Sequence, residues 1–112
     1  ESTIQSVSKQ LDLLKLNRKV MIDCSHGNCQ KDYTKQTNVA QSICEQIQSG
    51  SQNICGIMLE SHLTEGKQSL KKETLDPGQS ITDPCLSLEQ TEPILEQLAN
   101  AVRIRNRNAV EL

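Results

Sequence analysis

The sequence predicts an α/β fold in which two parallel strands alternate with helices. Apolar residues recur every three or four positions in three segments, which is typical of amphipathic helices. Two short apolar runs lie between and after the first helical segments, and such runs are typical of buried strands. Because a helix separates the two strands, we expect them to pair in parallel through a right-handed crossover.

Three helices are expected, over residues 2–15, 36–49 and about 89–105. Ser2 and Gln5 stand three positions apart, as the partners of a capping box do, and predict the start of the first helix. Gly50 predicts a left-handed stop after the second helix. Pro93 is expected in the first turn of the last helix, where proline is tolerated.

The two strands are expected over residues 19–23 and 53–60, and the second is apolar on both faces. Residues 61–82 are polar and predict a long loop. Two parallel strands leave open edges and make no stable sheet alone. We therefore expect this segment to close a larger wound sheet or barrel, and its exposed apolar surface to favour self-association.

The composition argues against several classes of protein. Twelve basic and 14 acidic residues give a net charge of -2, and tyrosine supplies the single aromatic residue. Neither a basic surface nor a stacking platform for nucleic acid is therefore expected. No apolar run approaches the roughly 20 residues of a membrane helix, and the first residues do not resemble a secretory signal. We expect a cytoplasmic protein with no membrane or nucleic-acid partner.

The cysteines are odd in number and lack zinc-finger spacing. Cys24 and Cys55 lie in the strand-like runs, and Cys44 lies on the apolar side of a helical pattern. We expect small buried hydrophobic side chains in a reducing compartment, with a disulfide framework or a redox or metal-binding module as alternatives. The five positions are Cys24, Cys29, Cys44, Cys55 and Cys85.

A histidine and two acidic residues follow the predicted strands. His26 comes after the first strand, Glu60 ends the second, and Asp83 follows in the long loop. Because the carboxyl ends of parallel strands meet at one edge, these side chains should lie on one rim. An imidazole and two carboxylates suit Mn, Fe, Co or Zn. The alternative is a surface histidine at a turn, a glutamate at a strand end and an aspartate at a turn. His62 is expected to be a loop residue or to support a ligand.

Three lysines of the long loop would suit an anionic substrate, although a solvated loop is the favoured interpretation. They are Lys67, Lys71 and Lys72.

Three motifs resemble the C-terminal part of class I 3-deoxy-D-arabino-heptulosonate-7-phosphate (DAHP) synthase. They are VMIDCSHGNCQKDY (20–33), GIMLESHLTEGKQSL (56–70) and GQSITDPC (78–85). The resemblance extends from about residue 3 to residue 105. The stretches HGNCQK and GQSITDPCL are most similar to the tryptophan-sensitive bacterial isoenzyme.

The resemblance implies a (β/α)8 TIM barrel that condenses phosphoenolpyruvate with erythrose 4-phosphate, the first step of the shikimate pathway to the aromatic amino acids. Residues 1–112 would supply the last two strands and the last three helices, with no separate second domain. The motifs D-x-S-H-x-N, M-x-E-S and S-I-T-D imply that His26, Glu60 and Asp83 bind the divalent metal.

The family's remaining metal ligand, a cysteine, and its phosphate-binding residues belong to earlier strands. No cysteine here matches that ligand, so we expect this chain to be inactive alone and to act as a homo-oligomer or with an N-terminal portion. The alternative is a non-catalytic remnant that acts as a binding or oligomerising module. The loop also departs from the family, with Pro77-Gly78 in place of Tyr-Gly and Ser87-Leu88 in place of Gly-Trp.

Overall fold

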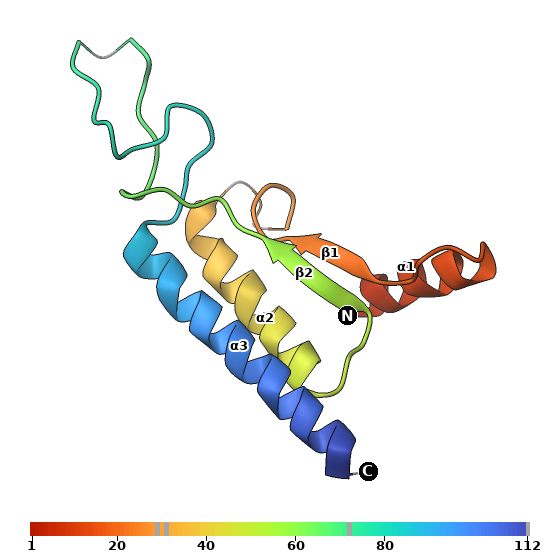
Figure 1. The fold of residues 1–112 in the computed structure, drawn as a ribbon. Helices are drawn as coiled ribbons and strands as arrows, with labels where there is room; N and C mark the ends of the chain where they lie inside the picture. The colour runs from red at the N-terminus through yellow and green to blue at the C-terminus, as the bar shows by residue number, and fades with distance from the viewer. Residues whose placement is uncertain (29, 31, 72, 112) are drawn as a thin grey trace.

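The computed structural model describes residues 1–28, 30, 32–71 and 73–111. Strands β1 and β2 are parallel neighbours, so the predicted α/β order and parallel pairing are confirmed. Helices α2 and α3 lie side by side on one side of the strands, and α1 extends beyond β1 (Figure 1). The elements are α1 (Ser2–Leu13), β1 (Val20–Asp23), the 3-10 helix η1 (Tyr33–Lys35), α2 (Gln36–Gln48), β2 (Ile54–Met58) and α3 (Leu88–Glu111).

The ends of the helices differ from the prediction in their capping. Glu1 is the N-cap of α1 and makes no side-chain capping hydrogen bond, so the predicted capping box at Ser2 and Gln5 is wrong. Ser2 is already helical, whereas a capping side chain must come from the residue before the helix. Gly50 has a φ of 106°, which confirms the left-handed stop after α2.

A capping box forms instead at the start of α3. The Gln90 N–H donates to Ser87 Oγ at 3.1 Å, and the Ser87 N–H donates to Gln90 Oε1 at 2.8 Å. The helix begins at Leu88 and continues to Glu111, beyond the predicted end. Pro93 is therefore the sixth helical residue, inside the helix and beyond the predicted first turn.

The core lies between α2, α3 and the face of the sheet that they cover. Helix α2 buries residues at helical spacing, and Ile94 and Ala101 of α3 pack against them. Aliphatic side chains and thiols fill this core, as the scarcity of aromatic residues requires. Its buried members are Cys24, Ala40, Ile43, Cys44, Ile47, Ile54, Leu86, Ile94 and Ala101.

Part of the sheet remains uncovered. Met21 of β1 is 62% exposed and Met58 of β2 is 44% exposed, so neither strand is buried on both faces within this chain. The prediction of a buried Cys55 is wrong, because nothing in the described residues covers that position, whereas Cys24, Cys44 and Cys85 are buried. Cys29 lies outside the described residues.

The dimensions agree with an open arrangement. The radius of gyration is 16.7 Å, compared with about 13 Å for a compact domain of this length. Among the described residues, no helix combines the length and apolar character needed to cross a membrane.

Replacing Ile94 with alanine tests the core. Ile94 is 1% exposed, so the Ile94→Ala chain should lose about 2–5 kcal/mol of unfolding free energy, because the removed side chain leaves a cavity. Urea denaturation followed by circular dichroism measures this. The neighbouring Leu95 is 56% exposed, and Leu95→Ala should change stability by no more than about 0.5 kcal/mol. Equal losses in the two variants would contradict this description of the core.

Candidate metal centre

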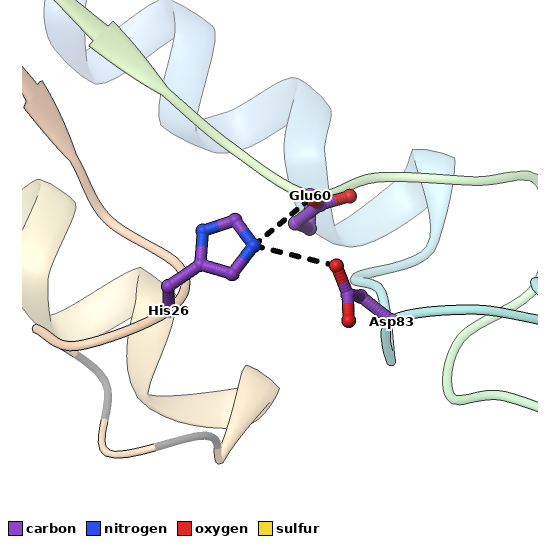
Figure 2. A group of neighbouring side chains, drawn as sticks. All are labelled: His26, Glu60 and Asp83. Atoms are coloured by element: carbon purple, nitrogen blue, oxygen red, sulfur yellow. Dashed lines mark hydrogen bonds and ion pairs between the residues drawn. The ribbon is translucent and has the colours of Figure 1, made fainter.

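Three side chains from separate segments meet beyond the carboxyl ends of the strands. His26 comes from the loop after β1, Glu60 from the chain just after β2, and Asp83 from the loop before α3 (Figure 2). His26 Nε2 lies 3.5 Å from Glu60 Oε1 and 3.3 Å from Asp83 Oδ2. One donor atom from each residue lies within 4.8 Å of the others. The structure therefore brings all three sequence-predicted residues to one point.

Asp23 orients the imidazole of His26. Its Oδ2 lies 2.7 Å from His26 Nδ1, and its Oδ1 accepts hydrogen bonds from the Ser25 N–H, at 2.9 Å, and from the Ser25 hydroxyl. Asn28 Nδ2 donates to the Asp23 carbonyl at 2.6 Å and closes the turn. With Nδ1 facing Asp23, Nε2 faces the two other carboxylates. Carboxylates commonly orient metal-binding histidines in this way.

These contacts change the acid–base properties of both partners. Hydrogen bonds from the Ser25 hydroxyl, and then from His26, lower the pKa of Asp23. The hydrogen bond to Asp23, and then the one to Asp83, raises the pKa of His26. The neighbouring carboxylates therefore favour the protonated form of His26.

Polar contacts hold the loop that carries Asp83. The Gln68 side chain is buried; its Nε2 donates to the carbonyls of Asp76 and Gln79, and its Oε1 accepts from the Asp76 N–H. His62 Nδ1 lies 2.6 Å from the Gly78 carbonyl. His62 is therefore a loop residue, as expected, and is not part of the three-residue cluster.

Gly78 lets the loop that leads to Asp83 pack closely against residues 63–64. It is buried, and a Cβ atom there would meet Thr64 Oγ1 at 3.2 Å and Leu63 Cβ at 3.4 Å. The main chain at Gly78 thus lies directly against residues 63–64. Isolated bridges join Lys67 to Ser80 and Gly66 to Cys85 in the same region. Asp83 follows this braced segment.

A cavity of about 610 Å³ opens at the cluster. Tyr33, Gln36 and Lys67 line it together with the three predicted residues. Lys67 is exposed in the loop, as expected, and it lies at the lining of this cavity. Lys71 is exposed, and Lys72 lies outside the described residues.

Sequence reasoning assigned no role to two residues that organise the cluster. Asp23 had a detectable signal, because it lies three positions before His26 in the D-x-S-H motif. Gln36 had none, since a glutamine at the start of an amphipathic helix ordinarily faces solvent, yet it is fully buried here.

Comparisons with known proteins match this chain to one enzyme family and to several of its members. The DAHP synthetase I family matches residues 1–96. The tyrosine-inhibited phospho-2-dehydro-3-deoxyheptonate aldolase of Schizosaccharomyces pombe is 47% identical over 110 residues, covering 94% of this chain and 30% of the relative. The tryptophan-sensitive enzyme of Escherichia coli K12 is 52% identical over 87 residues, covering 77% of this chain and 25% of the relative.

A solved structure agrees with these sequence matches. The phospho-2-dehydro-3-deoxyheptonate aldolase of Francisella tularensis SCHU S4 superposes with a TM-score of 0.90 at 47% identity, over 94% of this chain and 30% of that one. The present chain thus spans about 30% of the length of such relatives. The chain belongs to the DAHP synthetase I family.

Proposed function

We propose that this chain is the metal-ligand segment of a DAHP synthase barrel, which condenses phosphoenolpyruvate with erythrose 4-phosphate. Residues 1–112 would contribute the last two strands and the last three helices of that barrel. The observation that carries the proposal is the meeting of His26, Glu60 and Asp83 in a chain of this family. These residues would hold a divalent Mn, Fe, Co or Zn ion.

The donor set suits such an ion, and the two spacings from His26 fit its coordination shell. Donors about 2.0–2.2 Å from a transition metal lie roughly 3–3.6 Å apart when they are adjacent in a tetrahedral or octahedral shell. His26 Nε2 lies 3.5 Å and 3.3 Å from the nearest oxygens of Glu60 and Asp83. When bound, the metal would polarise the aldehyde of the sugar phosphate as a Lewis acid. The chain's own contribution is to hold one imidazole and two carboxylates ready at the strand ends.

Completion of the barrel by the rest of the protein accounts for the surfaces left open here. The exposed side chains of Met21 and Met58 lie on the sheet, and a cavity of about 460 Å³ lies between α1, β1 and α2. In the complete barrel, a further parallel strand would pair with the edge of β1 that faces away from β2. A second copy of the chain is the alternative source of cover.

The predicted likeness to the tryptophan-sensitive isoenzyme remains a prediction. That relative has the higher local identity, 52% over 87 residues, but the tyrosine-inhibited relative matches over 110 residues at 47%. The effector, if one acts on the complete protein, would be identified by assaying it with each aromatic amino acid.

Alanine substitutions test the ligand set. His26→Ala, Glu60→Ala and Asp83→Ala should each weaken Mn²⁺ binding by at least about tenfold, because each removes one of the three proposed donor atoms. Isothermal titration calorimetry on the purified chain measures the affinity. His62→Ala is the matched control and should bind as the unaltered chain does. If none of the three substitutions weakens binding, the ligand assignment is wrong.

Metal binding should strengthen with increasing pH. The pKa of His26 is raised above its ordinary value of 6.5, so a proton competes with the metal up to and beyond that pH. Affinity should rise through the raised pKa and then level off. Asp23→Asn removes the largest cause of the shift and should move the midpoint to lower pH, with weaker binding at the plateau because the imidazole loses its orienting carboxylate.

Calorimetric titrations between about pH 5.5 and 8.5 measure this dependence, because that interval spans the usual range of imidazole pKa values. Asp32→Asn serves as the control, because Asp32 bonds to Thr34 and should leave the midpoint unchanged. A midpoint that stays in place in Asp23→Asn would contradict the role given to that carboxylate.

Activity is tested by supplying the missing part of the barrel. Mixing this chain with the preceding residues of the S. pombe relative, in the presence of Mn²⁺, should restore DAHP formation from the two substrates. The same mixture made with the Glu60→Ala chain should remain inactive, because it lacks a metal ligand. A stable complex that holds the metal but forms no product would favour the non-catalytic alternative.

A further inference from the structure

Gln36 is the most deeply buried polar side chain near the metal centre. It is the first residue of α2 and is 0% exposed. A buried amide must find hydrogen-bond partners, since leaving its donor or acceptor unsatisfied is costly. Its partners therefore indicate what it does.

Both partners are main-chain groups of Glu60, its N–H and its carbonyl. The Glu60 N–H donates to Gln36 Oε1 at 2.9 Å, and Gln36 Nε2 donates to the Glu60 carbonyl at 3.2 Å. Strand β2 ends at Met58, whose carbonyl accepts the Cys24 N–H at 2.9 Å. The sheet therefore stops short of Glu60, and the amide of Gln36 replaces the missing strand neighbour.

The main chain of Glu60 also connects to the loop that carries Asp83. The Glu60 carbonyl accepts a second hydrogen bond, from the Leu86 N–H at 2.9 Å. Leu86 is 1% exposed and follows Asp83 by three residues, so its main chain is anchored in the core. One carbonyl thus joins the start of α2 to the segments that supply both carboxylates.

We propose that Gln36 is a positioning residue for the metal centre: its side-chain amide holds the main chain of Glu60 on both sides of its Cα, so that the Glu60 carboxylate reaches His26 and Asp83. The inference rests on the proposed metal site and extends it to a residue that would not touch the ion. A side chain that only filled space would be replaceable by one of the same volume, whereas one that positions Glu60 requires its amide.

The test compares Gln36→Met with Gln41→Met. Methionine keeps the length and approximate volume of glutamine but lacks both hydrogen bonds. Gln41 is an exposed glutamine of the same helix and provides the matched control. We expect Co²⁺ affinity to fall about 10–100-fold in Gln36→Met, as it does when other supporting partners of metal ligands are removed. The Co²⁺ absorption bands should shift as well, and Gln41→Met should change neither property.

A double-mutant cycle with Glu60→Ala separates positioning from a general structural effect. If Gln36 acts through Glu60, the double variant should bind Co²⁺ as weakly as Glu60→Ala alone. An equal loss from Gln36→Met in both backgrounds would overturn the inference. So would an unchanged affinity in Gln36→Met when Glu60→Ala weakens binding, although the metal site would then stand. If Glu60→Ala has no effect, the proposed metal site itself fails.

Gln36→Glu provides a second variant in case Gln36→Met does not fold. Its carboxyl oxygen still accepts the Glu60 N–H but, when ionised, offers no donor to the Glu60 carbonyl. We expect an affinity between those of the unaltered chain and Glu60→Ala, and no further loss when Gln36→Glu is combined with Glu60→Ala. An unchanged affinity in a folded Gln36→Glu chain at pH 8 would count against the inference.

Discussion

Parallel pairing of β1 with β2 is the constraint on which the candidate metal centre depends. The pairing aligns Asp23 with Met58, so both strands leave the sheet at the same edge. His26 follows β1 and Glu60 follows β2, so only a short stretch of chain separates each residue from the point where the two side chains meet. Antiparallel strands would have sent these two residues to opposite ends of the sheet. Helices α2 and α3 stabilise the pairing by covering one face with aliphatic side chains.

Polar side chains take over where the sheet ends. Asp23 orients His26, Gln36 holds the main chain of Glu60, and Gln68 braces the loop that leads to Asp83. A different segment thus holds each proposed ligand, and fixed hydrogen bonds limit the reorganisation needed when an ion binds. The His26, Glu60 and Asp83 side chains are 51%, 31% and 59% exposed. Because packing holds such exposed side chains only weakly, these hydrogen bonds are needed to fix their positions.

The same chain leaves much of its sheet uncovered. The methionines at 21 and 58 are exposed, and α1 extends beyond β1, with Ile4 packed against the core formed by α2 and α3. These features agree with a segment that spans about 30% of the length of its relatives. Under the proposed function, the remaining strands cover these surfaces and supply the substrate pocket, while this segment contributes the rim that carries the metal ligands.

Apolar periodicity and residue order were sufficient to predict the helices, both strands, their parallel pairing and the three residues that meet at the rim. These features follow from local spacing and from the general rule that parallel strands end at one edge. Only the tertiary structure decided that Gln36 is buried against Glu60, that Cys55 is exposed, and that α3 is capped by Ser87 and Gln90 while α1 has no capping box. Those outcomes depend on which distant segment covers a residue or satisfies its hydrogen bonds, and neither is encoded in the spacing of its near neighbours.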